Sequence, residues 1–276
     1  MISYRKKKNI ENLVKYFVLI FCAIIVLIPL LITISSSLKN ESALFDFPFR
    51  FIPKKATSNN FAQLLEKFPL YTFNSVKVTL TIVIVQVITA STGAYVFSKI
   101  EWKGRDIIFG LYLASMMIPS QAVMIPQFLI IRKMGLYDTH AALVLLGSFT
   151  AFGTFLIRQF MLSIPMTYNE AARIDGAKEW TIFLSLILPM SKAVLVTQII
   201  FSFRFFWNDF FTPLIYITTD KLKTLPLGMT DFVREQYVYW GPQLAAALIS
   251  IIPVLIVFLF GQKYFIQGVA SSGLKG

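Results

Sequence analysis

The sequence predicts an all-α, polytopic membrane protein with six transmembrane helices. Of its 276 residues, 56% are apolar and only 14% are charged, whereas soluble domains carry about 25% charged residues. The apolar residues gather in segments long enough to cross a hydrocarbon core of about 30 Å. The net charge of +12 lies in segments that flank these apolar runs. This placement favours contact with membrane lipid over binding of nucleic acid.

Six apolar segments account for most of the chain. We expect a cytoplasmic basic N-terminus at residues 1–15 and a single transmembrane domain at residues 16–276. The predicted spans lie near residues 16–38, 78–98, 107–131, 141–162, 193–219 and 241–261. A cytoplasmic loop at residues 163–192 joins the fourth span to the fifth.

The first span follows a strongly basic segment. Five basic residues precede it, and residues 16–38 carry no charge: the basic residues are Arg5, Lys6, Lys7, Lys8 and Lys15. A signal peptide begins in the same way, but this apolar run is too long for one. The positive-inside rule then places the N-terminus in the cytoplasm. Six spans return the C-terminus to the same side.

The second and third spans each have two interpretations. The second span is rich in Thr and contains Gln86, and such residues indicate either helix contacts or the lining of a path. Pro119 and Pro126 must kink or break the third span, and Gln121 lies between them. Broken helices in transporters often border a substrate path, although a kink can also serve packing alone.

The fifth span is unusual because it contains charges. Arg204 and Asp209 are costly within a membrane unless they meet a partner or water. On a regular helix they are roughly 140° apart, so each needs another helix, another subunit or a wet cavity. Trp207 and Asn208 stand between them, and an aromatic face beside polar groups suits a sugar. We therefore select Gln121, Trp207, Asn208 and Asp209 as substrate-path candidates, with a structural polar cluster at a subunit seam as the alternative.

The stretch from Glu170 to Pro189 carries charges between two apolar spans, so it must lie at a membrane face. Gly176 in its middle is unfavourable in a helix interior and permits a turn. We predict a short helix from about Tyr168 to Ile174, a bend at Asp175 and Gly176, and a second helix that returns to the bilayer. Such a segment presents a surface to a partner in water, or is an ordinary amphipathic interfacial loop.

This stretch resembles the signature of ABC importer permeases. The resemblance rests on Glu170-Ala171-Ala172, Asp175-Gly176-Ala177 and Ile187-Leu188-Pro189. It implies that the loop is a coupling helix, which docks in a groove of a cytoplasmic ATPase. The implied ATPase-coupling residues are Glu170, Ala171, Ala172, Asp175, Gly176 and Ala177. One departure is Ala193, because many relatives have a proline a few residues after Pro189.

Further motifs look like the carbohydrate branch of these permeases, closest to the second, shorter maltose-type subunit. They are Ala94-Tyr95, Phe97-Ser98, Lys103-Gly104, Ile118-Pro119, Ile125-Pro126, Gly135-Leu136, Trp207-Asn208-Asp209 and Gly268 to Gly276. The resemblance implies the six-helix core of a type I ABC importer permease in a bacterial cell membrane. It also implies a second permease subunit, usually a different chain, two cytoplasmic ATPase subunits and an extracytoplasmic sugar-binding protein. In this family the position of Arg204 is not expected to hold a charged residue, so the role of Arg204 is open.

Several function classes lack their motifs in this sequence. It contains no GxxxxGK[ST] phosphate loop, so we expect no cofactor in this chain and place ATP and Mg²⁺ on the partner ATPase. It also contains no HExxH motif, and His140 and Cys22 are the only residues of their types. We therefore predict no metal site and no enzyme activity. An ion-coupled secondary transporter is the alternative, but it normally needs more spans or internal repeats.

Overall fold

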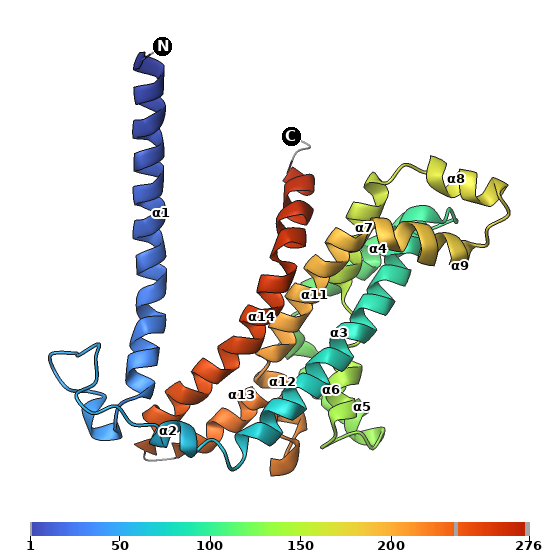
Figure 1. Ribbon diagram of the computed structural model, residues 1–276. Coiled ribbons are helices and arrows are strands. Elements are labelled where there is room, and N and C mark those ends of the chain that lie inside the picture. The colour runs from blue at the N-terminus through green and yellow to red at the C-terminus, as the bar shows by residue number, and fades with distance from the viewer. Residues whose placement is uncertain (1, 235–236, 274–276) are drawn as a thin grey trace. The chain divides into compact units, whose positions relative to one another are not determined.

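The computed structural model describes residues 2–234 and 237–273, and its regular secondary structure is almost entirely helical (Figure 1). The all-α prediction is confirmed. Within the described ranges, the only sheet is an antiparallel pair in which Val233 lies opposite Val238. The chain forms two compact units, Met1–Lys67 with Met229–Ile251 and Phe68–Gly228 with Ile252–Gly276. The most apolar window of the first helix has no buried residue among those described. The single transmembrane domain at residues 16–276 stays a prediction.

The first unit contains the N-terminal helix and the start of the last helix. Its elements are α1 (Ile2–Ser37), η1 (Glu41–Ala43), α2 (Asn59–Ala62), η5 (Met229–Phe232), β1 (Val233–Arg234), β2 (Tyr237–Val238) and the beginning of α14 (Trp240–Gly273). Glu41 caps α14, because its carboxylate accepts hydrogen bonds from the backbone N–H groups of Trp240 at 2.8 Å and Gly241 at 3.0 Å. A carboxylate at this end is also favoured by the helix dipole.

The second unit contains the packed helices. Its elements are α3 (Phe68–Lys99), α4 (Arg105–Ala114), η2 (Ser115–Met117), α5 (Ser120–Lys133), α6 (His140–Gly147), α7 (Ala151–Ser163), α8 (Thr167–Ile174), α9 (Glu179–Ile182), η3 (Phe183–Ile187), α10 (Leu188–Met190), α11 (Lys192–Trp207), α12 (Phe211–Tyr216), η4 (Asp220–Leu222), α13 (Leu225–Gly228) and the remainder of α14. The long helix α3 packs most extensively against α7 and then against α11. It is the central element of this unit.

Two apolar clusters lie along α3. Near its Lys99 end, α3 packs against α7 and the segment from α9 to α11 through a cluster that includes Ala94, Ile157 and Ile187, all of them fully buried. Toward its Phe68 end, the second cluster joins α3 to α5, α6 and α12. Figure 1 shows α8 and α9 beside one end of α3.

Three helices are long and apolar enough to cross a membrane, and bent helix pairs raise the number of candidate spans to six. The three are Glu11–Ser37 in α1, Phe68–Lys99 in α3 and Trp240–Lys263 in α14. Each begins before its predicted range, and α3 begins ten residues before the predicted 78–98. The first ends one residue before the predicted 38, whereas the other two also end later than predicted. Polar residues such as Asn74 and Ser75 are buried in its first turns, which sequence patterning assigned to a loop.

The third and fourth predicted spans are bent pairs. Between α4 with η2 and α5 the chain turns by 97°, and Ile118 immediately before Pro119 is extended, with φ −81° and ψ 115°. Proline disfavours the helical region for the residue before it, so the predicted break is confirmed at Pro119. Pro126 lies inside α5 without ending it. The pair α6 and α7 bends by 40°.

The fifth span, predicted over residues 193–219, is not one helix. α11 ends at Trp207, and a separate helix, α12, begins at Phe211. The side chain of Asp209 accepts a hydrogen bond from the backbone N–H of Thr212 at 3.0 Å, so it caps the new helix. The predicted angle between Arg204 and Asp209 assumed an unbroken helix and therefore does not apply.

Candidate functional site

The predicted helix and bend after the fourth span are present. α8 covers Thr167–Ile174, and Gly176 has a φ of 80°, in the left-handed region that favours glycine. Its N–H donates to the carbonyl of Arg173 at 3.0 Å, and the N–H of Ala177 donates to the carbonyl of Ala172 at 2.9 Å. These two bonds form a Schellman motif, which satisfies the last carbonyls of α8.

α8 buries one face and exposes the other. Asn169 is fully buried, and Ala172 and Ala177 are partly buried against the apolar cluster at the Lys99 end of α3. The other predicted coupling residues are exposed: Glu170, Ala171, Asp175 and Gly176. Ile174 is 87% exposed.

Hydrogen bonds and an ion pair hold α8 to its neighbours. The hydroxyl of Tyr95 donates to Glu179 Oε2 at 2.7 Å, and Arg173 Nε donates to Glu179 Oε1 at 2.7 Å. The amide of Asn169 donates to the Tyr95 oxygen over a longer distance of 3.4 Å. One carboxylate therefore connects α3, α8 and α9.

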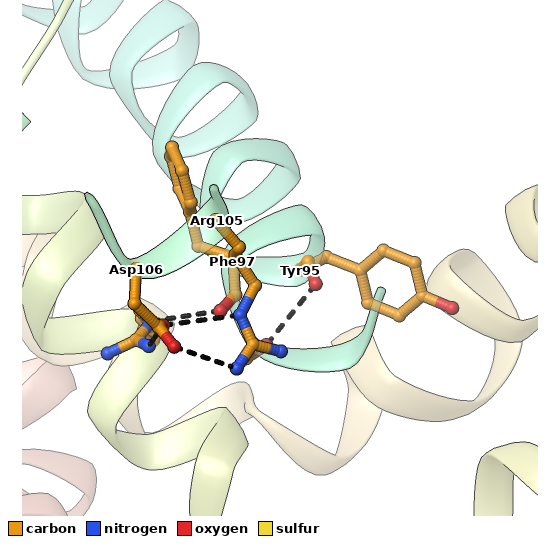
Figure 2. Close-up of polar contacts among 6 residues, drawn as sticks. Tyr95, Phe97, Arg105 and Asp106 are labelled. Carbon is orange, nitrogen blue, oxygen red and sulfur yellow. Dashed lines mark hydrogen bonds and ion pairs between the residues drawn. The ribbon is translucent and has the colours of Figure 1, made fainter. Parts of the chain in front are cut away.

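A second polar cluster fixes the turn between α3 and α4 (Figure 2). Arg158 of α7 donates through Nε to the carbonyl of Phe97 at 2.9 Å and through Nη2 to Asp106 Oδ1 at 3.0 Å. Its guanidinium group lies over the ring of Phe109, 4.1 Å from the centroid. Arg105 adds a second ion pair to Asp106 at 3.2 Å. Arg158 thus joins three helices around a single side chain.

The predicted substrate-path residues fall into different environments. Trp207 is only 1% exposed and stacks on Phe203 with ring centroids 5.6 Å apart. We expected a ring face open to a sugar, and the structure instead buries this ring because residue 207 turns toward the packed side of α11. Asn208 is exposed and donates to the carbonyl of Arg204 at 2.7 Å. Gln121 is exposed and accepts from the Ser120 hydroxyl at 3.3 Å.

A cavity of about 590 Å³ lies within the second unit. Arg204 and Asp209 are among its lining residues, whereas Gln121, Trp207 and Asn208 are not. Its walls come from α3, α5, α6, α11 and α12 and from the break before α7, and they combine phenylalanine rings with amide and hydroxyl groups. A volume of this size is typical of small-molecule sites.

A buried polar chain forms part of the cavity wall. Gln198 Nε2 donates to the Ser202 hydroxyl at 2.8 Å, and this hydroxyl donates to Gln86 Oε1 at 2.6 Å. Gln86 Nε2 then donates to the carbonyl of Gly147 at 2.6 Å. The sequence offered one signal for Gln198 and Ser202, which are four residues apart and share a helix face. Their contact with Gln86 depends on packing between helices and could not be derived from spacing.

In the part of the chain that the structure describes, no three His, Cys, Asp or Glu residues gather as metal ligands would. The described residues instead form a short helix with one exposed face, a packed helical unit and a cavity with a mixed polar and aromatic lining.

Comparisons with known proteins agree with this arrangement. The family described as binding-protein-dependent transport system inner membrane component matches residues 86–271. The probable ABC transporter permease protein YurM of Bacillus subtilis is 34% identical over 275 residues, which cover 99% of this chain and 91% of the relative. The arabinooligosaccharides transport system permease protein AraQ of Halalkalibacterium halodurans is 31% identical over 261 residues, covering 93% of this chain and 94% of the relative.

A solved structure is also similar. It is described as the crystal structure of a bacterial ABC transporter involved in the import of the acidic polysaccharide alginate. The similarity has a TM-score of 0.81 with 26% sequence identity and covers 93% of this chain and 97% of the other. These matches confirm the resemblance drawn from the sequence motifs. The chain therefore belongs to the family of binding-protein-dependent transport system inner membrane components.

Proposed function

We propose that this chain is the membrane-spanning permease subunit of an ATP-driven importer for a sugar or an oligosaccharide. The observation that carries the proposal is the α8 segment, a short helix ended by Gly176 that exposes one face while its other face packs on the transmembrane unit. The substrate class follows from the relatives, since AraQ is named for arabinooligosaccharides and the similar structure for the polysaccharide alginate.

The chain acts within a larger assembly. A second permease subunit completes the translocation path, and a heterodimer fits the maltose-type resemblance. Two cytoplasmic ATPase subunits bind ATP and Mg²⁺, so this chain needs no cofactor or ATPase site of its own. An extracytoplasmic sugar-binding protein delivers the substrate, as the family description supports.

The docking face consists of exposed residues of α8 and the turn after it. Glu170, Asp175 and Gly176 face away from the packed unit, where a groove of the ATPase can receive them. Ala172 and Ala177 pack against the apolar cluster instead, and their small side chains keep α8 close to the unit. Motion of the ATPase then reaches the membrane helices through α8.

The cavity is the part of the path that this chain supplies. Arg204 and Asp209 line it, and a water-filled path lowers the cost of both charges. Phenylalanine rings and amide groups in the same wall suit the CH faces and hydroxyl groups of a sugar. Asn208 and Gln121 are exposed and face the second permease subunit, while Trp207 supports the wall from behind.

The test uses Gly176 in the assembled complex. Gly176→Leu places a side chain in a left-handed conformation that costs roughly 1–2 kcal/mol, although a Cβ there would meet no atom of the described residues within 4 Å. We expect this variant to insert normally and to lose the ATP hydrolysis that the sugar-loaded binding protein stimulates. Gly176→Asn is the control, because Asn tolerates this conformation, and it should keep most of the stimulation.

Normal stimulation in Gly176→Leu would contradict the docking role. A second measurement separates the importer from an ion-coupled secondary transporter. At fixed ATP, uptake of a panel of neutral oligosaccharides should persist when a protonophore collapses the proton gradient. Immediate loss of uptake would favour the secondary transporter.

A further inference from the structure

The last turns of α3 contact the chain just before α8 and again just after the bend that follows α8. Lys99 Nζ donates to the carbonyl of Ile164 at 2.5 Å, at the point where α7 ends and the chain enters α8. Tyr95 is one helical turn earlier, on the same face of α3. Its hydroxyl donates to Glu179 Oε2 at 2.7 Å, where the chain leaves the bend and α9 begins.

The burial of the Lys99 side chain requires a physical explanation. It is 3% exposed, and a buried ammonium group is costly unless it meets a strong acceptor. The Ile164 carbonyl is such an acceptor, since it lies at the negative end of the α7 dipole. The bond fixes the distance between the end of α7 and the end of α3.

Tyr95 combines packing with a polar contact. Its ring is 4% exposed and lies against the ring of Phe183, with centroids 5.1 Å apart. Its hydroxyl reaches a carboxylate that Arg173 of α8 also binds. A hydrogen bond to a charged acceptor is stronger than one between two neutral groups. Tyr95 therefore holds α9 directly, and it holds α8 through Glu179 and through the longer 3.4 Å hydrogen bond from Asn169.

α3 is suited to carry a force across the unit. Of the four candidate spans between Phe68 and Trp207, α3 is unbroken and the other three are bent pairs. Its 32 residues extend about 48 Å at 1.5 Å per residue. At its other end, Asn74 Nδ2 donates to the carbonyls of Lys221 and Lys223, both at 2.9 Å. Polar contacts therefore fix both ends of one unbroken helix.

We propose that Lys99 and Tyr95 are positioning residues for energy coupling, which hold α8 and α3 together as one rigid body. A displacement imposed on α8 by the ATPase then moves the whole of α3, including the end that holds the Lys221 to Lys223 segment. The inference rests on the proposed function, because it assumes that an ATPase docks on α8.

The test measures a distance within this chain in the assembled complex. Spin labels are attached at Lys77→Cys on α3 and Lys178→Cys beside α9, both exposed positions, in a Cys22→Ser background. Pulsed electron resonance gives the distance distribution before and after trapping with Mg²⁺, ATP and vanadate. We expect a narrow distribution that trapping does not change, because both labels move together.

Lys99→Met keeps most of the aliphatic stem and removes the donor, and Tyr95→Phe removes one oxygen and keeps the ring contact. Both variants should retain the ATPase on purification, yet their distributions should broaden and shift on trapping. The matched controls are Lys103→Met, at an exposed lysine, and Tyr112→Phe, whose hydroxyl has only a long 3.5 Å contact with Thr154. Both should match the parent.

The Glu179→Gln variant completes the design. If Tyr95 acts through Glu179, combining Tyr95→Phe with Glu179→Gln should add little to either single change. A parent distance that shifts on trapping, or a Tyr95→Phe distribution identical to the parent, overturns the proposal even if Lys99→Met fails to fold. Loss of the ATPase from the parent complex would instead contradict the proposed function, so the two failures are distinguishable.

Discussion

Asp138 shows how one carboxylate can fix a connection between distant segments. It lies between α5 and α6 and adopts a φ of 58°, a left-handed conformation that Asp tolerates. Its Oδ2 accepts from the Thr219 hydroxyl at 2.5 Å, and its Oδ1 accepts from the N–H groups of Thr219 at 3.0 Å and Thr218 at 2.8 Å. These hydrogen bonds, that of the Thr219 hydroxyl above all, lower the pKa of Asp138 to about 2.

The lowered pKa predicts a pH dependence of stability. The folded pKa of Asp138 lies below the unfolded value of about 3.9, so its stabilising effect is fully present above pH 4 or so. It is lost as the pH falls from there toward 2. The melting temperature of the detergent-purified protein should exceed that of Asp138→Asn at pH 7, and the difference should shrink toward pH 2.

Asp46→Asn, at an exposed position in the other unit, is the control and should follow the parent at every pH. A difference between the parent and Asp138→Asn that stays constant across this range would contradict the role assigned to the carboxylate. It would show that the contacts depend on the shape of the side chain and not on its charge.

Residue types predicted some positions and not others. Gly176 was identifiable because glycine in a helical pattern has few uses, and a bend is one of them. The open ring face expected for Trp207 was wrong, since an aromatic residue beside polar ones fits an open ring face and a buried ring equally well. Its place on the substrate path stays a prediction. Asp138 attracted no prediction because its partners Thr218 and Thr219 lie about 80 residues away.

At the scale of elements, the break between α6 and α7 shows how a bent span is stabilised. The carbonyls of Gly147 and Ser148 have no continuing helix to bond. Gln86 Nε2 donates to the first at 2.6 Å, and the Thr89 hydroxyl donates to the second at 2.9 Å. Thr150 then caps α7 by accepting from the N–H of Gly153 at 3.1 Å. Side chains of α3 thus complete the backbone bonding of its neighbours.

Gln86→Leu should therefore destabilise the fold. The change leaves the buried Gly147 carbonyl without its donor and the Ser202 hydroxyl without its acceptor, and one such group costs about 1–3 kcal/mol. We expect a lower melting temperature of the purified protein. Thr81→Val is the control on the same helix, because the Thr81 hydroxyl bonds only the carbonyl of Lys77 one turn earlier. If both variants melted at the same temperature, the satisfied break would have little energetic weight.

The elements differ in how well their sequence predicts them. The apolar runs were enough to predict that the spans exist. Pro119 was enough to predict the main break, because proline restricts the backbone of the residue before it. The end of α11 at Trp207 was missed, since the local signal is only Asn208 and Asp209 within a long apolar segment. The Thr and Gln residues of α3 kept two interpretations, and Gln86 fits both, because it bonds neighbouring helices and also lines the cavity.

At the scale of the whole molecule, the predicted topology assigns each loop to one face of the membrane, and experiments can test these assignments. The candidate span Glu11–Ser37 has 27 residues, which extend about 40 Å at 1.5 Å per residue. This length exceeds a hydrocarbon core of about 30 Å. The basic residues before it favour the cytoplasmic side for the N-terminus, so residues that follow Ser37 should be outside. The proposed ATPase contact requires α8 to be inside.

Single cysteines test this topology in the intact cell. Cys22 is the sole cysteine and is not in a disulfide, so a Cys22→Ser background removes the native thiol. Ser42→Cys and Lys178→Cys then place a thiol at exposed positions in η1 and beside α9. We expect a membrane-impermeant maleimide to label residue 42 in intact cells and to label residue 178 only after permeabilisation. Labelling of residue 178 from outside would place α8 on the wrong face for a cytoplasmic ATPase. Protection of residue 42 alone would change only the orientation assigned to the first span.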